Sequence, residues 1–303
     1  MNKRLWFALV LISPCIISSG LAQIEAPTSV PTAVNAKLVL DAAGPEQRRS
    51  LANVYLIACP TSTGAELGTG FLINRGIIVT NAHVTATCNE TNLLGVSTAS
   101  EQIHFSKVIK DQDLDLALLV PSKPLSGGYS LAVSDSITPG TQVSTWGYPF
   151  YYNGISPLLS VGYISGYRVV STNGKDVKHL VINGAFNHGN SGGALLESQQ
   201  TDVIGIVVAT YHFYPPEVKQ IIDGLSSYQS GFMIGSLRQA DGSQKPVSEA
   251  QITAMVLNEF YEKTQVMIGE AIAVSELTKL IKDNSQDLPK KSGVVKVSQR
   301  LAK

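Results

Sequence analysis

The sequence is poor in charged residues and in cysteine, and it has no long apolar run after its N-terminal segment. Of its 303 residues 15% are charged, and 23 Lys and Arg side chains balance 23 Asp and Glu side chains. The lack of a basic excess argues against a nucleic-acid-binding protein. A hydrophobic content of 44% supplies a folded core and argues against a disordered chain. The lack of later apolar runs argues against membrane-spanning helices there.

Residues 1–22 have the pattern of a secretory signal peptide. Lys3 and Arg4 precede an apolar run, which ends in small residues before a predicted cleavage after Ala22. One alternative is a membrane anchor, which the shortness of the run and its internal proline disfavour. A lipoprotein, suggested by Cys15, is disfavoured by the proline directly before that cysteine. We therefore expect an exported protein, and the sequence leaves open whether it is periplasmic or secreted.

Two cysteines, Cys59 and Cys88, remain after the expected cleavage. An even pair in an exported protein predicts a disulfide, because such proteins meet an oxidising compartment. The alternative is two unrelated buried thiols. A single disulfide is too little to build a fold on, so the apolar core must supply most of the stability.

From Leu51 onward, short β-rich runs alternate with clusters of Gly, Asn, Asp, Pro and Ser. This texture predicts an all-β barrel or sandwich and not alternating βαβ units. The predicted strands include Val54–Ala58, Gly70–Ile73, Ile77–Thr80, Ile103–Ile109, Leu116–Val120, Val143–Trp146, Val161–Ser165, Leu180–Ile182 and Val203–Ala209.

The texture becomes helical after Tyr211. Apolar residues at helical spacing, and a capping box formed by Ser248 and Gln251, predict two amphipathic helices within 211–265. A last strand is expected near Val266–Val274 and leads into a helix that starts at Ser275. The tail 284–303 is basic, and we expect it to be solvated.

One segment carries the pattern of a serine nucleophile: Gly189-Asn190-Ser191-Gly192-Gly193. A serine attacks a carbonyl only when a base takes its proton and hydrogen-bond donors stabilise the oxyanion. Glycines let successive backbone N–H groups point into one concavity. The backbone of 189–191, with the Gly189 and Ser191 amides as donors, is therefore the candidate oxyanion hole. Taken alone, such a Gly-rich turn is common.

The base is expected to be His83, because it follows the apolar strand Ile77–Thr80 and so stands on a rigid element. His188 lies on the same loop as the serine, which makes it a candidate for lining the substrate cleft rather than the base. The remaining histidines lie in polar or loop-like contexts and are interpreted as structural or surface residues: His104, His179 and His212.

The carboxylate that orients the base is expected to be Asp115, at the mouth of the apolar run Leu116–Val120. A carboxylate entering an apolar run needs a partner, since burying it alone is costly. Asp111 and Asp113 are close rivals and are interpreted as solvated loop carboxylates.

The serine segment also matches G-x-S-x-G, the nucleophile elbow of the α/β-hydrolases. That fold requires an acid and a histidine after the serine, and only His212 lies downstream of Ser191 among the histidines. Alternating helices are also missing before the serine. The elbow interpretation therefore fails.

The order His83, Asp115, Ser191 resembles the chymotrypsin-type serine peptidases, and within them the HtrA/Deg-like bacterial branch. The resemblance rests on three motifs in the family's order and at similar spacing, and it covers about residues 50–210 and the elements near 266–283. The motifs are Thr80-Asn81-Ala82-His83-Val84, Asp115-Leu116-Ala117 and Gly189-Asn190-Ser191-Gly192-Gly193-Ala194-Leu195, with lesser echoes at Gly68-Thr69-Gly70-Phe71, Gly147-Tyr148-Pro149-Phe150, Gly162-Tyr163-Ile164-Ser165-Gly166 and Val203-Ile204-Gly205-Ile206.

The resemblance implies an all-β fold of two six-stranded antiparallel β-barrels, with a His83–Asp115–Ser191 triad in the cleft between them. It implies a serine endopeptidase acting on protein or peptide substrates, without a metal or cofactor. An acid six residues before the nucleophile would select Arg or Lys in trypsin-like relatives, and Ala185 occupies that place, so we expect an apolar or small residue before the cut bond. The candidate substrate-contacting residues are Ala185, His188, Val208 and Ala209.

The resemblance also divides the chain into parts. A protease domain over 50–283 follows the signal peptide and an arm over 23–49, and its barrels cover about 50–135 and 136–283. The insertion 211–265 is larger than expected for the family, and the tail 284–303 is too short for the PDZ domain that HtrA proteins usually carry. A lid, an oligomer contact, a substrate-shaping element or a plain surface hairpin are all open roles for the insertion. A catalytically silent binding or chaperone-like protein on the same fold remains the alternative function.

Overall fold

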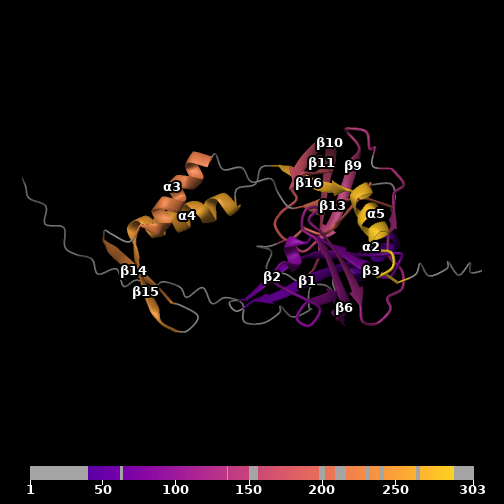
Figure 1. The fold of residues 1–303 in the computed structure, drawn as a ribbon, viewed down its shortest axis with the longest axis horizontal. Helices are drawn as coiled ribbons and strands as arrows, with labels where there is room; N and C mark the ends of the chain where they lie inside the picture. Colours follow the sequence, from indigo (N-terminus) through magenta and orange to yellow (C-terminus); the bar gives the residue numbers. More distant parts are fainter. Residues whose placement is uncertain are drawn as a thin grey trace, which may run out of the picture. The chain divides into compact units, whose positions relative to one another are not determined.

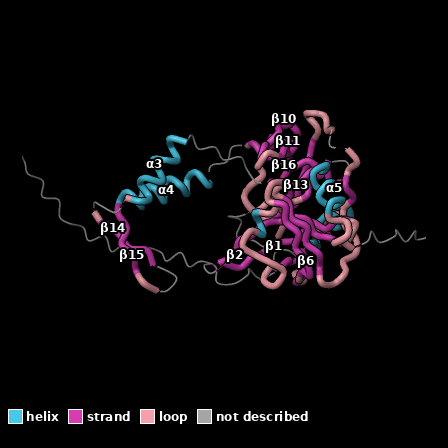
Figure 2. The backbone as a smooth tube through the Cα atoms, viewed as in Figure 1, coloured by secondary structure: helices cyan, strands magenta, loops and turns pink. Residues whose placement is uncertain are grey.

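The computed structural model describes residues 40–61, 64–134, 136–149, 156–197, 202–208, 216–228, 232–238, 242–263 and 267–289. Strands dominate this part of the chain and form two seven-stranded sheets and a separate two-stranded hairpin (Figures 1 and 2). The expected signal peptide, most of the expected arm, Ala209 and His212 lie outside the described residues.

The first sheet has the strand order β5-β4-β1-β2-β3-β7-β6. Its end strands β5 and β6 are joined through the single residue His104, so the sheet must curl to bring its two ends together. Its pairings are antiparallel throughout. The strands are β1 (Val54–Thr61), β2 (Gly64–Ile73), β3 (Ile77–Thr80), β4 (Leu94–Ser97), β5 (Gln102–Ile103), β6 (Phe105–Asp111) and β7 (Leu116–Pro121).

The second sheet closes into a six-stranded antiparallel barrel, because β12 pairs with both β9 and β13. A further short strand, β8, joins β13 in parallel. The chymotrypsin-like double barrel expected from the sequence is thereby confirmed. The strands are β8 (Ser130–Leu131), β9 (Gln142–Gly147), β10 (Leu158–Thr172), β11 (Lys175–Gly184), β12 (Ala194–Glu197), β13 (Asp202–Val208) and β16 (Ile268–Ala273).

A shared apolar core joins the two sheets. β-branched and leucine side chains from both sheets form one buried cluster with helix α5 (Val274–Asp283), which packs on β13 and β16 (Figure 1). α5 begins one residue before the expected Ser275. Burying such side chains is the main favourable term in folding. Buried members of the cluster include Phe71, Val79, Leu114, Val177 and Ile206.

Helix α2 (Pro45–Leu51) occupies the end of the segment expected to be an arm. The sequence signals for the start of this helix are weak, because the segment is rich in Ala and Pro. They are nevertheless present, since Pro45 occupies the first helical position and Glu46 lies in the first turn. Leu51 at its end is fully buried. Thr98, the residue after β4, donates its hydroxyl to the Leu51 carbonyl at 3.0 Å, so the helix that ends the arm is attached to the first sheet.

The insertion contains two helices, as expected, and a hairpin that sequence patterns did not indicate. Its elements are α3 (Pro216–Ser227), β14 (Met233–Arg238), β15 (Gln244–Ser248) and α4 (Glu249–Lys263). The capping box is confirmed: the Ser248 amide donates to Gln251 Oε1 at 3.0 Å, and the Gln251 amide donates to Ser248 Oγ at 3.3 Å. The buried apolar residues of the insertion include Ile222, Val247 and Ala254.

Candidate active site

His83 and Asp115 lie together at one end of the first sheet. β3 and β7 are neighbours, so His83, just after β3, and Asp115, just before β7, come to the same edge. The carboxylate binds the histidine twice: Oδ1 accepts the His83 backbone N–H at 2.9 Å, and Oδ2 lies 2.8 Å from ring Nδ1. A carboxylate acceptor places the ring proton on Nδ1, which leaves Nε2 as the free base. The His83 side chain is 50% exposed and therefore accessible.

A buried asparagine holds Asp115 from the side of the histidine strand. Asn81 is fully buried, and its Nδ2 donates to the Asp115 backbone carbonyl at 2.9 Å. Asp115 has a φ of +52°, a left-handed backbone conformation that few non-glycine residues adopt. The rivals Asp111 and Asp113 do not contact His83; both are ion-paired with Lys175 of the second barrel.

The serine segment forms a compact turn before β12. The Asn190 amide donates to the Asn187 carbonyl at 3.0 Å, and the Gly193 amide donates to the Asn190 carbonyl at 2.9 Å. A methyl group at Gly192 would lie 2.1 Å from Thr69 O and 2.2 Å from Thr80 Oγ1, so only glycine fits at position 192. The turn is therefore pressed directly onto the first sheet.

Thr69 of β2 joins the serine turn to the first barrel. Its hydroxyl donates to the Gly189 carbonyl at 2.6 Å and accepts the Tyr148 amide at 3.0 Å. Its backbone amide donates to the Ser191 carbonyl at 2.8 Å, and its own carbonyl accepts the Thr80 hydroxyl at 2.7 Å. Since Thr80 stands three residues before the histidine, these bonds bring the segments of Ser191 and His83 to one place.

Two amides of the turn remain candidates for the oxyanion hole. Gly189 has a φ of +94°, and within the described part of the chain its amide donates no hydrogen bond. The Asn190 amide is engaged inside the turn, and the Asn190 side chain is buried. The Gly189 amide is therefore compatible with the predicted oxyanion hole, the Ser191 amide stays a predicted donor, and Asn190 supports the turn.

The other predicted site residues are spread around the serine. Ala185 and His188 are partly exposed on the segment between β11 and the turn, and Val208 is the partly buried last residue of β13. His179 is not at the site: it is buried on β11, and its Nδ1 lies 2.9 Å from Glu270 Oε2.

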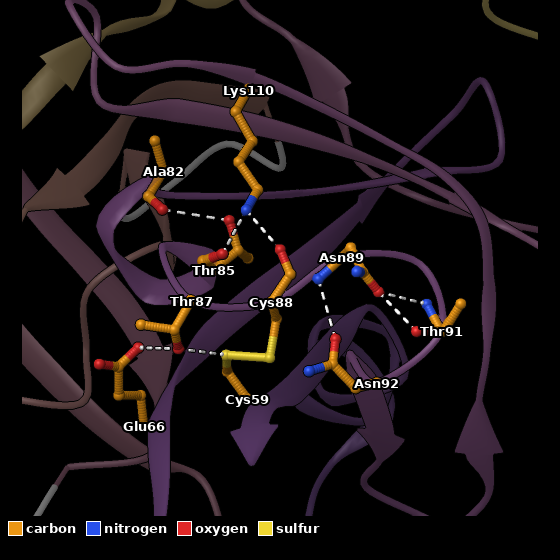
Figure 3. The surroundings of a disulfide bond; sticks show 10 residues. All are labelled: Cys59, Glu66, Ala82, Thr85, Thr87, Cys88, Asn89, Thr91, Asn92 and Lys110. Carbon is orange, nitrogen blue, oxygen red and sulfur yellow. Dashed lines mark hydrogen bonds between the residues drawn. A yellow bond between two sulfur atoms is a disulfide. The ribbon is translucent and has the colours of Figure 1, made fainter. Parts of the chain in front are cut away.

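A disulfide fixes the segment that follows His83. Cys59 of β1 and Cys88 are bonded, with their Cα atoms 5.7 Å apart (Figure 3). Lys110 of β6 donates to the carbonyls of Thr85 and Cys88, the latter at 2.6 Å (Figure 3). Burial lowers the pKa of the Lys110 ammonium. The short helix η1 (His83–Thr85) is thus held at its end by a cation and a covalent bond, which restricts the histidine backbone.

Sequence reasoning missed Thr69, Asn81 and Lys110 as parts of the site. The signal for Thr69 was its place between two glycines in Gly68-Thr69-Gly70, which brings its strand close to the serine turn. In the described ranges, no group of three or more His, Cys, Asp or Glu side chains is placed to hold a metal ion. No helix of those ranges is long and apolar enough to cross a bilayer.

Residues 68–206 match the profile of the trypsin-like peptidase domain family. The curated relatives include the magnetosome formation protease MamE of Paramagnetospirillum magneticum, 36% identical over 51% of this chain and 21% of that protein. They also include Protease Do-like 1 of Arabidopsis thaliana, 35% identical over 48% of this chain and 33% of that protein. The periplasmic serine endoprotease DegP of Salmonella typhimurium is 30% identical over 47% of this chain and 30% of its own length. This chain thus spans a third or less of each of these relatives.

Solved structures show the same fold at low identity. The HtrA-type protease AlgW, solved with a tripeptide, is 20% identical with a TM-score of 0.51, over 85% of this chain and 64% of that one. An inactive form of the Rv3671c protease has 16% identity and a TM-score of 0.52, over 85% of this chain and 98% of that one. Residues 68–206 of this chain therefore match a trypsin-like peptidase domain and are similar in sequence to the MamE and HtrA-type serine proteases, and the solved structures share the fold.

Proposed function

We propose that the protein is a serine endopeptidase that cleaves peptide bonds with Ser191 as nucleophile. The observation that carries the proposal is the double contact of His83 with Asp115, beside a serine turn tied to the same sheet through Thr69. A histidine whose Nδ1 is held by a carboxylate presents Nε2 as a base, which is what a serine nucleophile requires. The protease relatives of the domain support this assignment.

The proposed reaction follows from the roles of these groups. Ser191 Oγ attacks the peptide carbonyl carbon while His83 Nε2 takes the hydroxyl proton, and Asp115 stabilises the imidazolium that forms. The amides of Gly189 and Ser191 donate to the oxyanion. The intermediate collapses as His83 gives its proton to the leaving amine, which leaves an acyl-serine. Water, activated by His83, then releases the acid product and restores the serine.

The substrate class is proposed to be protein chains or peptides with an apolar or small residue before the cut bond. Ala185, in place of an acid, leaves no charge at that position to select Arg or Lys. His188, Val208 and Ala209 are the other residues proposed to contact substrate. A role in protein quality control or protein processing fits this chemistry, and DegP, one of the relatives, is by name a periplasmic endoprotease.

Export is proposed as well, to the periplasm or beyond the cell. The signal-like residues 1–22 and the disulfide between Cys59 and Cys88 support it, because structural disulfides persist in oxidising compartments. The mature protease domain is proposed to cover residues 50–283, with the insertion 211–265 as part of it.

The experiment is turnover of an unstructured protein substrate by the purified mature chain and three single variants. Removing the nucleophile or the base, in Ser191→Ala or His83→Ala, is expected to lower kcat by about 10⁶, and Asp115→Asn by about 10⁴. Each variant is checked for folding by circular dichroism. Turnover retained in Ser191→Ala would refute the proposal, whereas a folded wild-type protein without turnover would favour the binding-protein alternative.

A further inference from the structure

The tip of one hairpin of the second barrel lies against the loop that carries Asp115. β10 and β11 are joined by a two-residue turn, Asn173-Gly174, with Thr172 paired to Lys175. Both turn residues have positive φ, +50° and +78°, which is the backbone of the type I′ turn that Asn-Gly favours. The turn therefore places Asn173 and Lys175 on a rigid support.

Both carboxylate oxygens of Asp113 accept hydrogen bonds from this hairpin. Asn173 Nδ2 donates to Asp113 Oδ1 at 2.7 Å, and Lys175 Nζ donates to Asp113 Oδ2 at 2.8 Å. Lys175 Nζ also lies 3.6 Å from Asp111 Oδ2. We call these four residues (Asn173, Lys175, Asp111 and Asp113) the hairpin latch, since they join the second barrel to a loop of the first.

The latch is connected to Asp115 through the loop backbone. Asp111 Oδ1 accepts the amides of Asp113 and Leu114, both at 3.0 Å, which folds the loop into a tight turn directly before Asp115. The latch and the Asn81 bond thus hold the loop on both sides of Asp115, whose positive φ is uncommon for a non-glycine residue.

Charge gives the lysine a second effect on the loop. Asp111, Asp113 and Asp115 place three carboxylates within five residues, and they repel one another. Lys175 supplies a cation to two of them, and its hydrogen bond, followed by that of Asn173, lowers the pKa of Asp113. Lys175 therefore offsets part of the repulsion in the loop that leads to Asp115.

We propose that the hairpin latch positions Asp115 for its bond to His83, so that the second barrel sets the geometry of a pair that belongs wholly to the first. Asn173 and Lys175 act as positioning residues, since neither contacts the histidine in the structure. The inference rests on the proposed function, in which Asp115 orients the catalytic base. Packing of the two barrels would then have two effects: it would orient the His83–Asp115 pair, and it would bring Ser191 to that pair.

The test removes the latch while keeping the hairpin. Asn173→Gly keeps the positive-φ turn, because glycine adopts that conformation freely, and deletes the donor to Asp113. Lys175→Met deletes the cation and keeps a long apolar side chain. Lys178→Met is the matched control: Lys178 is on the same strand, and its Nζ lies 4.6 Å from the centre of the Tyr167 ring. Lys175→Arg is the conservative rescue.

Two readouts are needed, one of which does not depend on turnover. The first readout is kcat and KM. We expect kcat of the Asn173→Gly/Lys175→Met variant to fall roughly tenfold with KM unchanged, a smaller fall in kcat than that expected for Asp115→Asn. The second is the low-field proton resonance of His83 Nδ1–H in the NMR spectrum. We expect it to move upfield or broaden in the double variant and to stay unchanged in Lys178→Met and Lys175→Arg.

The two readouts separate the latch from the proposed function. An altered resonance in a protein that shows no turnover would support the latch and refute the peptidase. An unchanged resonance and unchanged kcat in the double variant would overturn the latch and leave the peptidase standing. Absence of the resonance from the wild-type protein at a temperature low enough to slow exchange with water would overturn the latch too.

Discussion

The backbone amide of Thr69 donates to the carbonyl of Ser191 at 2.8 Å, which ties the proposed nucleophile to the first barrel. The Thr69 side chain strengthens the same connection through the Gly189 carbonyl. The proposed nucleophile belongs to one sheet and the base to the other, so the geometry of catalysis depends on how firmly the barrels are joined. Besides the shared apolar core, two polar bridges near the candidate site contribute to this joining: Thr69 at the serine and the hairpin latch at the aspartate.

Thr69→Val removes a hydroxyl that is fully buried and serves two backbone groups. The Gly189 carbonyl and the Tyr148 amide would lose their partner, and leaving these two buried polar groups unsatisfied is expected to cost about 2–6 kcal/mol in total. Urea denaturation measures the loss of stability, and kcat should fall as the serine turn loosens. Thr69→Ser keeps the hydroxyl and is the control. Equal stability of the valine and serine variants would show that the hydroxyl bonds are unimportant.

Gly269→Ala is expected to destabilise the second barrel, because a methyl group there would lie 2.6 Å from Cδ2 of the buried Phe186. Overpacking of this kind costs about 1–3 kcal/mol. Gly166→Ala, in the same barrel but with open space around it, is the control and should be nearly neutral. Adding Phe186→Leu to Gly269→Ala should recover part of the loss, and thermal unfolding of wild type, Gly269→Ala, Phe186→Leu and the double variant measures the coupling. Simple additivity of the two substitutions would contradict the close contact.

The ion-paired cluster on the second barrel predicts a dependence of stability on pH. The hydrogen bond from His179, followed by the charge of Arg168, holds the pKa of Glu270 below its ordinary value of 4.5. A lowered folded-state pKa means that ionised Glu270 stabilises the fold above about pH 4.5, and that this contribution is lost as the pH falls through the lowered value.

Comparison of wild type with Glu270→Gln by urea denaturation from pH 3 to pH 7 measures this contribution. The difference in the free energy of unfolding should be constant near neutral pH and should shrink on acidification. A difference that grows as the pH falls would contradict a lowered pKa of Glu270 in the folded state.

Reduction of the disulfide should weaken the first barrel. The bond joins residues 29 apart in the sequence, and a closed loop of that size stabilises a fold by about 3–4 kcal/mol if the effect is the lost entropy of the unfolded chain. The Cys59→Ala/Cys88→Ala variant should unfold at lower urea than wild type, and reductant should affect only the wild type. We expect this variant to change kcat less than it changes stability, because Lys110 still donates to the carbonyls of Thr85 and Cys88. Unchanged stability of the double variant would refute a structural role for the bond.

Much of the fold can be predicted because its strands are short apolar runs in the sequence. The run Ile77–Thr80 predicts a strand, and β3 has the same bounds. Two strands that lack a local signal have identifiable reasons: β4 contains Gly95, and β15 contains Pro246, which disfavours strands. These segments become strands because neighbouring strands pair with them, which a local pattern does not reveal.

Some residues of the candidate site can likewise be predicted from the sequence, and others cannot. The places of His83 and Asp115 at strand ends predict their pairing, and the structure shows them bonded. The hydrogen bond from Asn173 to Asp113 spans 60 positions and that from Thr69 to Gly189 spans 120. Such contacts depend on how the two barrels pack together. Asn173 is an ordinary residue for a turn and Thr69 for a strand, so their types give no signal in the sequence. Sequence patterns therefore identify groups that do chemistry more readily than groups that hold them.

Activation of Ser191 as a nucleophile underlies the whole proposed reaction, and labelling with a fluorophosphonate probe detects it without any knowledge of the substrate. The mature protein would be labelled beside Ser191→Ala, His83→Ala and a heat-denatured sample, and the modified peptide would be identified by mass spectrometry. We expect modification of Ser191 in the folded wild-type protein and none in the three controls. Labelling of another residue, or no labelling of the folded protein, would contradict an activated Ser191.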